Sequence, residues 1–198
     1  MTRNTRAHLV WAHPREKSLT SSLVHAVNES LVARGYVVDE LDLYRSGFDP
    51  VLHEADEPNW DDPSKVYSDE VETLVGRVQN CDIVVVVFPL WWYSLPAILK
   101  GYIDRVWNFG RLYDDPSLPK PSAIVWVALA GTTNEPLKSG GHIDALANQL
   151  DAGIAGYCGI ANSRTVVLPD TIDSPNLAAY VEQVSRMLDE SIEISRGQ

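Results

Sequence analysis

Three consecutive aromatic residues mark the first place where this sequence could do chemistry. Trp91, Trp92 and Tyr93 follow an apolar, β-branched run over residues 83–88, which ends at Pro89. Three adjacent side chains cannot all face a core, so we expect at least one ring to contact solvent, a ligand or a partner chain. A flat heteroaromatic ligand stacks well on such rings. The alternative is burial in the core, which is usual for a single aromatic residue.

A second candidate is the polar segment over residues 13–22, which follows the first apolar run of the chain. It contains His13, two basic residues and several hydroxyls, among them Ser18 and Thr20, just before a predicted helix. A helix N-terminus presents free N–H groups and a positive dipole end, so the segment predicts a cradle for phosphate. It has no glycine and matches neither a Walker loop nor a dinucleotide fingerprint. Alternatively, Ser18 is only an N-cap and His13 only ends a strand.

The third candidate is the segment over residues 131–142, which has turn residues throughout. Its glycines let backbone amides approach a ligand, and His142 at a helix start could polarise or protonate a bound carbonyl. A surface connection with a bystander histidine is the alternative. Residues 107–113 add the aromatic side chains of Phe109 and Tyr113, which suit a pocket wall or a subunit interface. No nucleophile, metal-ligand or paired-carboxylate spacing is present, so reactive chemistry would come from a cofactor.

The elements that position these residues alternate between strands and helices. Apolar runs predict strands over residues 7–12, 36–43, 83–88, 123–130 and 165–168, and helical periodicity predicts helices over 18–34, 68–78, 97–107, 143–154 and 174–192. This is the pattern of a single α/β domain over residues 1–198, a doubly wound five-stranded parallel sheet in the flavodoxin-like order 2-1-3-4-5. That order brings the loops after strands one, three and four together. We expect the acidic stretch over residues 44–65 to be an ordered loop.

Composition narrows the class of function. A net charge of −11 argues against nucleic acid or an anionic membrane as the main partner, which favours small-molecule chemistry. Cys81 and Cys158 form no close pair and no zinc spacing, so we expect neither a disulfide nor a metal, and a reducing compartment. No signal peptide or membrane span is predicted, which indicates a cytoplasmic protein.

The central stretch from Phe88 to Val106, with its run Pro-Leu-Trp-Trp-Tyr-Ser-Leu-Pro, closely resembles the signature of the NAD(P)H:quinone oxidoreductase family, whose members are flavodoxin-like flavoproteins. Two further blocks agree with that family: Ala12-His13-Pro14 followed by Ser18, and Asp42-Leu43-Tyr44 followed by Phe48 and Pro50. The resemblance extends from the first strand through the fifth.

The resemblance implies a flavin at the carboxyl edge of the sheet. His13, Ser18 and Thr20 would contact its phosphate or pyrophosphate. The isoalloxazine would lie against Pro89, Leu90, Trp91, Trp92 and Tyr93, with Ala130, Gly131 and Thr132 at its other edge. His142 resembles the family's histidine near the reacting ring, and we assign Tyr93 with it to catalysis. Tyr113, with Phe109, resembles the aromatic side chains that close the pocket from a partner subunit.

By this resemblance the chain is a homodimeric NAD(P)H dehydrogenase (quinone) that carries FAD, or alternatively FMN, and passes hydride from NAD(P)H to a quinone or related acceptor. It lacks the C-terminal extension of the mammalian enzymes, as the short bacterial members do. Two other classes stay open: a regulatory flavoprotein subunit that docks on a potassium efflux transporter, and a one-electron flavodoxin carrier. Leu137 stands about where mammalian enzymes carry a tyrosine, which leaves His142 alone in proton handling.

Overall fold

The computed structural model describes residues 5–196 and contains one five-stranded parallel sheet in the order β2-β1-β3-β4-β5. The predicted fold class and strand order are thereby confirmed. The expected single domain over residues 1–198 stays a prediction, and its two ends lie outside the described residues. The strands are β1 (Arg6–Trp11), β2 (Val37–Asp42), β3 (Ile83–Pro89), β4 (Ala123–Leu129) and β5 (Ser163–Leu168).

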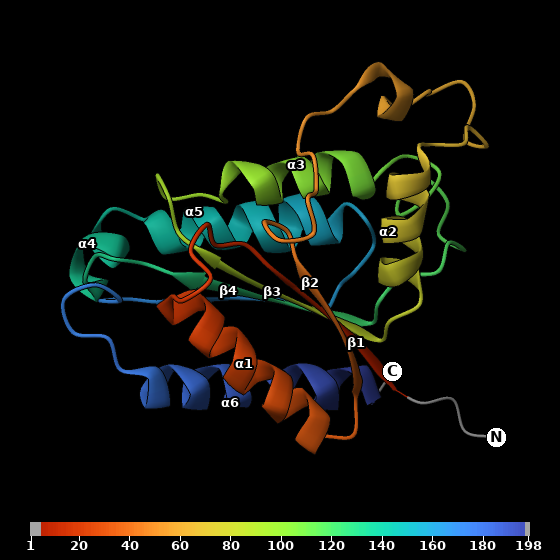
Figure 1. The fold of residues 1–198 in the computed structure, drawn as a ribbon. Helices are drawn as coiled ribbons and strands as arrows, with labels where there is room; N and C mark the ends of the chain where they lie inside the picture. The colour runs from red at the N-terminus through yellow and green to blue at the C-terminus, as the bar shows by residue number, and fades with distance from the viewer. Residues whose placement is uncertain (1–4, 197–198) are drawn as a thin grey trace.

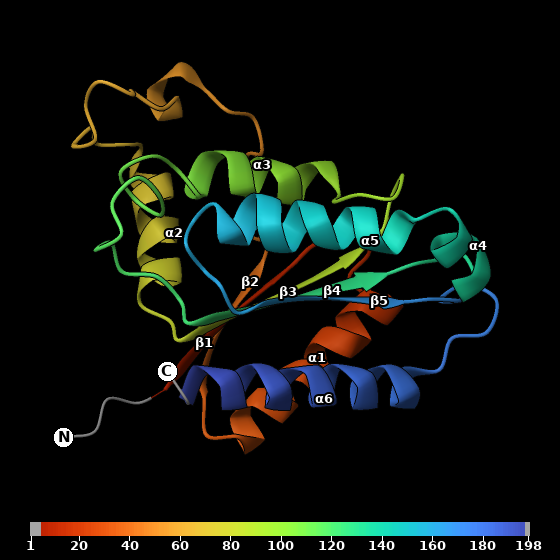
Figure 2. The ribbon, with the colours of Figure 1, turned by 180° about the vertical axis from the view of Figure 1, so that it is seen from behind.

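Helices cover both faces of this sheet (Figure 1). α1 and α6 lie on one face, and α2, α3 and α5 lie on the other, as the view from behind also shows (Figure 2). Among residues 5–196 no helix combines the length and the apolar character needed to cross a membrane. The helices are α1 (Leu19–Ala33), the short 3-10 turn η1 (Glu54–Asp56), α2 (Asp69–Gln79), α3 (Ala97–Val106), α4 (Asn134–Ser139), α5 (His142–Ala147), η2 (Asn148–Gly156) and α6 (Leu177–Arg196).

The two central strands are buried along their whole length because helices cover both of their faces. Every residue of β3 and of β4 is buried, which explains why both segments read as continuous apolar runs in the sequence. Alternate side chains of each strand enter two different cores. Val84 and Trp126 pack under α2 and α3, whereas Val85 and Val127 pack against α1 and α6.

The segment after β4 departs from the prediction of turns throughout. Asn134–Ser139 form the helix α4, which buries Leu137 completely. Pro136 is tolerated there because it sits in the first turn, where its missing N–H costs no helical hydrogen bond. The predicted helix over residues 143–154 is present, but its second half, η2, has the wider π-helical hydrogen bonding.

The acidic stretch over residues 44–65 is ordered, as predicted, because a buried ion pair ties it to α3. Arg105 donates to Asp56 at 2.8 Å and to Glu70 at 2.7 Å, and both side chains of the Arg105–Asp56 pair are almost fully buried. The side-chain amide of Asn108 adds a 2.7 Å hydrogen bond to the carbonyl of Asp56. The loop is thereby anchored along one side of α3 and next to the segment that follows this helix.

Candidate functional site

A cavity of about 310 Å³ lies at the carboxyl edge of the sheet, where the loops after four strands meet. It sits at the topological switch point, since β1 and β3 are neighbours in the sheet while their connections run to opposite faces. The loops after strands one, three and four come together as predicted, and the loop after β5 joins them. The lining residues are His13, Arg15, Ser18, Leu19, Thr20, Pro89, Leu90, Trp91, Leu129, Gly131, Thr171 and Ile172.

The wall after β3 is a tight turn built on the aromatic triplet. The backbone N–H of Leu90 donates to Leu129 at 2.8 Å, which extends the pairing of β3 with β4 into the site. Trp91 and Ser94 then exchange two backbone hydrogen bonds of 3.2 and 3.0 Å across Trp92 and Tyr93. Both central residues have positive φ, 52° and 57°. A side chain in this left-handed region costs about 1 kcal/mol or more, a strain that recurs at functional sites.

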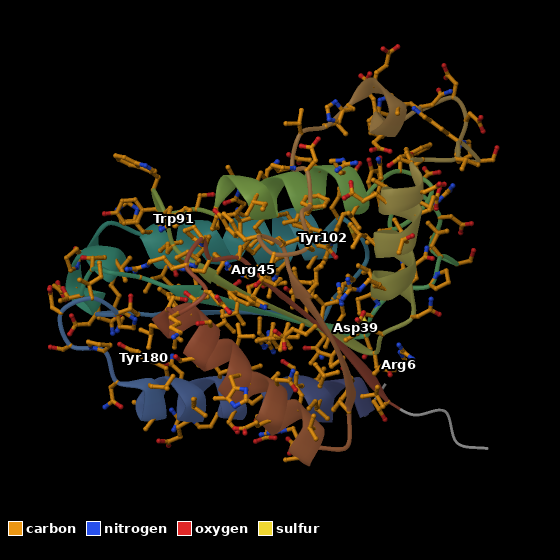
Figure 3. All side chains as sticks on the ribbon, viewed as in Figure 1. Arg6, Asp39, Arg45, Trp91, Tyr102 and Tyr180 are labelled. Carbon is orange, nitrogen blue, oxygen red and sulfur yellow. The ribbon has the colours of Figure 1, made fainter. Side chains whose placement is uncertain are left out.

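The turn sends its three rings in different directions, which confirms that they do not all face the core. Trp91 lines the cavity, and Figure 3 shows it at the end of the sheet from which α3 starts. Trp92 is 97% exposed and takes no part in the lining. Tyr93 stacks on His142, with ring centroids 3.7 Å apart and planes inclined by only 11°. The structure therefore brings the two predicted catalytic side chains together from separate loops.

The loop after β1 ends in the capped N-terminus of α1. Ser18 is the N-cap, and its hydroxyl accepts the N–H of Ser21 at 3.1 Å while the Ser21 hydroxyl accepts the N–H of Ser18 at 3.0 Å. The N-cap that was the alternative interpretation of Ser18 is therefore present, while its contact with a phosphate stays a prediction. These bonds occupy the amides of Ser18 and Ser21. The amides of Leu19 and Thr20 have no partner within the helix, because they belong to its first turn, and these two residues line the cavity. That end has the donors and the dipole that an anion needs.

An arginine from outside the cavity braces this loop. Arg45 donates to the carbonyls of His13 and Pro14, pairs with Asp42, and lies over the ring of Trp11 at 5.3 Å. Figure 3 shows Arg45 between the loop and the sheet. The motif Asp42-Leu43-Tyr44 therefore supports the cavity indirectly, through the shape of the loop after β1.

Electrostatics inside the cavity favour an anionic ligand. Arg15 lines it, whereas no carboxylate does, although the chain has a net charge of −11. Burial lowers the pKa of His13 below its usual value, so its ring is neutral at pH 7. The Nδ1 atom of His13 lies 3.1 Å from both the backbone nitrogen and the carbonyl oxygen of Arg15. In the tautomer in which Nδ1 accepts the N–H of Arg15, the Nε2–H of His13 can donate to a ligand. A neutral donor and a guanidinium suit a phosphate group.

The loop after β4 approaches the cavity closely and is held by the loop after β5. Ala130 accepts the N–H of Thr171 at 3.0 Å, and Thr132 accepts the N–H of Asp170 at 2.8 Å. A side chain on Gly131 would lie 2.5 Å from Ile172, so glycine is needed for this approach. Of the predicted trio, Gly131 lines the cavity, while Ala130 and Thr132 support it by their carbonyls.

Sequence reasoning did not identify the contribution of the loop after β5. Thr171 and Ile172 line the cavity, and Ile172 is 74% exposed although it is a large apolar residue. Their residue types carry no chemical signal. The predicted position of β5 next to β4 was the one feature that placed this loop at the same edge.

Phe109 and Tyr113 lie far from the cavity of their own chain. They follow α3, so they stand at the opposite end of this helix from Trp91, beside α2 (Figure 1). Phe109 is buried beneath Trp60, with ring centroids 5.1 Å apart, and Tyr113 contacts Tyr157 at 5.1 Å. Neither residue lines the cavity of its own chain, and their expected role at the pocket of a partner subunit stays a prediction.

No group of three or more His, Cys, Asp or Glu side chains within residues 5–196 has the arrangement of a metal site. Cys81 and Cys158 are both buried free thiols, and burial raises the pKa of Cys81 to about 12 and of Cys158 to about 11. Neither thiol is a nucleophile at neutral pH. The chain's own side chains therefore offer binding, orientation and proton handling at the cavity.

Comparison with known proteins gives consistent matches over most of the chain. A family model described as a flavodoxin-like fold matches residues 5–189. An uncharacterized NAD(P)H oxidoreductase of Escherichia coli (strain K12), YcaK, is 43% identical over 167 residues, covering 84% of this chain and 85% of that protein. The human ribosyldihydronicotinamide dehydrogenase [quinone] is 28% identical over 198 residues, covering 88% and 84%. In fold, the chain resembles the NAD(P)H:quinone oxidoreductase from Methanothermobacter marburgensis, with a TM-score of 0.80, 24% identity and coverage of 93% and 94%.

Proposed function

Since the chain belongs to the flavodoxin-like family of NAD(P)H oxidoreductases and quinone reductases, we propose that it is a flavin-dependent enzyme that passes hydride from NAD(P)H to a quinone or a related acceptor. The observation that carries this proposal is one cavity bounded by an aromatic turn on one side and a capped helix N-terminus on the other. These two walls suit the two halves of a flavin nucleotide, a flat ring system and a phosphate.

The residues present fit such a cofactor. The amides of Leu19 and Thr20, with the neutral His13, would hold the phosphate or pyrophosphate. Pro89, Leu90 and Trp91 would support the ring system, and Gly131 would let it approach the loop after β4. When bound, a flavin supplies hydride transfer in both directions, which the protein's own groups cannot do. Trp92 and Tyr93 would contribute through their backbone and, for Tyr93, through the ring.

His142 is the residue that we assign to proton handling. Its ring stacks on Tyr93 at a centroid distance of 3.7 Å, next to the turn that carries Trp91, although neither ring is among the residues that line the cavity. A two-electron reduction of a quinone also requires protons at its two oxygens. In this proposal the imidazole of His142 donates a proton to one acceptor oxygen, while Tyr93 keeps the ring in a single orientation.

We propose FAD rather than FMN as the cofactor. An open depression of about 720 Å³ runs along α1 toward Leu177 of α6, and Ser18 lines both it and the cavity. A nucleotide that passes its pyrophosphate over Ser18 could place an adenosine in this depression. FMN would leave it empty.

We also propose that the enzyme works as a homodimer, in which Tyr113 and Phe109, which do not line the cavity of their own chain, would close the cavity of the second subunit. Its use of NAD(P)H would place it in the cytoplasm, where that donor is found. Neither proposal requires a metal or a nucleic acid.

Steady-state kinetics with purified, flavin-loaded protein test this function. We expect NAD(P)H oxidation that depends on quinone and gives parallel double-reciprocal lines, because donor and acceptor would use the same place in turn. His142→Ala should lower turnover with quinone, whereas His53→Ala, a matched change of an exposed histidine in the loop over residues 44–65, should leave turnover unchanged. A flavin-loaded protein that reduces no quinone, azo or nitro compound with NADH or NADPH contradicts the proposal.

A further inference from the structure

The outer edge of β5 is an open side of the sheet. β5 pairs with β4 alone, so it is an edge strand. Ile124 in β4 donates its N–H to the carbonyl of Asn162 at 2.9 Å, so the even-numbered residues of this strand direct their backbone groups toward β4. Thr165 and Val167 therefore direct theirs outward. In the part of the chain that the structure describes, no group outside the sheet bonds to these outward N–H and C=O groups.

The opposite edge of the sheet is partly closed by its own chain. Val37 in β2 donates its N–H toward β1, so Glu40 and Asp42 direct their backbone groups outward. The carbonyl of Glu40 accepts from Arg77 at 2.8 Å, and the carbonyl of Asp42 accepts the N–H of Ser46 at 2.9 Å. At β5 two successive outward residues stay free, and such an edge is a template for pairing with another chain.

A groove of about 370 Å³ runs along the free edge of β5. Residues 165–167 form its floor. Gln183 and Met187 of α6 form one rim, and Lys138 of α4 with Ile143 of α5 belong to the other. Figure 2 shows β5 between α5 and α6, which cover opposite faces of the sheet. A strand edge with a rim on each face has the form of a site for an added strand.

The charges at this edge favour an acidic partner. Of the residues that line the groove, Lys138 alone carries a charge, and Arg164 is exposed on β5 itself. Neither side chain has an ion pair or a hydrogen bond within residues 5–196. Arg34, Arg77 and Arg186, by contrast, are each paired with a carboxylate. The β5 edge therefore presents two unpaired cations in a chain whose net charge is −11.

The same two cations disfavour a second copy of this chain as the partner. Two identical β5 edges related by a two-fold axis pair in antiparallel fashion, with the start of one strand beside the end of the other. Lys138 lines the groove together with Pro169, at the end of β5, whereas Arg164 is at its start. Self-pairing would therefore bring Lys138 of each copy toward Arg164 of the other, and like charges oppose this contact.

We propose that the edge of β5 binds an extended acidic segment of another protein as an added strand. Thr165 and Val167 pair with its backbone, and two of its carboxylates pair with Lys138 and Arg164. Arg164 shares a face of the sheet with Val166, which packs with α6, whereas Lys138 comes from the opposite face. Side chains alternate along a strand, so the two acidic residues stand an odd number of positions apart. The inference goes beyond the proposed reaction and does not depend on it.

Fluorescence anisotropy of labelled peptides with the full chain tests the charge contacts. The probe is a peptide of about nine residues, the length of an extended strand, with alternating Val and Thr and two Glu an odd number of positions apart. The same peptide with Lys in place of Glu should bind at least tenfold more weakly. Lys138→Glu should reverse this preference. Lys100→Glu, a matched change of an exposed lysine on α3, should leave it unchanged.

The backbone contacts have a separate readout. Thr165→Pro removes one outward N–H at an edge position, where proline is tolerated, and should weaken binding of the acidic peptide at least tenfold. Thr165→Val loses the 3.1 Å hydrogen bond to Asp151 but keeps that N–H, so it should bind normally. An acidic peptide N-methylated at alternate residues lacks the matching donors and should also bind at least tenfold more weakly. Amide hydrogen exchange should show Thr165 and Val167 protected by the unmodified peptide.

Equal binding of the acidic and basic peptides, or of the methylated and unmethylated ones, overturns the inference. Absence of binding by the acidic peptide at about 1 mM overturns it as well. Protection of Thr165 and Val167 by concentration alone, without peptide, would assign this edge to a second copy of the chain and would also refute the proposed partner.

Discussion

Gly140→Ala should separate the activity of this protein from its stability. Gly140 has ordinary helical backbone angles, φ −81° and ψ −3°, so alanine is compatible with its conformation. An added Cβ atom would nevertheless lie 2.5 Å from Nε2 and 2.6 Å from Cδ2 of His142. Ordinary contact begins near 3.4 Å, so the imidazole must move by about 1 Å, away from its stack with Tyr93.

A displacement of about 1 Å of a positioned catalytic group costs up to about 100-fold in rate. We therefore expect kcat/KM for quinone reduction to fall between about 10-fold and 100-fold. The free energy of unfolding should change by less than about 0.5 kcal/mol, because the lower entropy of the unfolded chain offsets a tight contact of 3.1 Å with the carbonyl of Pro136. The assay is steady-state kinetics, with urea unfolding of the same preparations.

Two further variants test whether Gly140 acts through His142. Gly76→Ala, at a site in α2 with open space around it, should keep full activity and add up to about 1 kcal/mol of stability. In a His142→Ala background, Gly140→Ala should cause no further loss of rate. Full activity of the Gly140→Ala single variant, or an equal additional loss in the absence of the imidazole, would show that Gly140 does not act through His142.

Three further predictions concern the elements around the site. Arg105→Leu leaves Asp56 buried without its cation and should lower the free energy of unfolding by about 3–5 kcal/mol. Adding Asp56→Asn should recover part of this loss. Strictly additive losses of the two substitutions in urea unfolding would argue against the ion pair. A hydrogen bond from His8, with Arg77, holds the pKa of Asp39 well below its usual value, so its contribution to stability is complete above about pH 4 and is lost as the pH falls. Asp39→Asn should therefore flatten the decline of stability between pH 5 and pH 2, and an unchanged slope would refute this assignment. Ser18→Ala should lower the free energy of unfolding by about 1 kcal/mol and Ser18→Gly by only a few tenths, because glycine is also a good N-cap. Thermal melts of flavin-free protein that rank the two variants in the reverse order would count against the capping role.

The framework of the fold is readable from the sequence because its strongest signals are local. The fully buried strands β3 and β4 are unbroken apolar runs, and the helices carry regular apolar faces. The strand order then brings His13, Leu90 and Gly131 to one edge, as predicted. Element ends differ from the predictions by one to a few residues, since caps such as Ser18 compete with other local hydrogen bonds.

What the sequence did not yield depends on contacts between distant residues. The stack of Tyr93 on His142 joins two loops about 50 positions apart, and the contribution of Ile172 needs the loop after β5 to fold against Gly131. The π-helical segment η2 was missed because a change from i+4 to i+5 hydrogen bonding leaves the apolar spacing almost unaltered. Trp92 is fully exposed because the backbone of its turn has positive φ angles, and the residue types in that turn do not predict such angles.

The absorbance spectrum of the purified protein, with mass analysis of the compound released on denaturation, shows whether the chain binds a flavin and which one. We expect a yellow protein that releases about one FAD per chain and bleaches on addition of NAD(P)H. Ser18→Ala should bind the same cofactor more weakly, because the cap that holds the phosphate end of α1 is lost. A colourless protein that takes up neither FAD nor FMN on reconstitution would contradict the account.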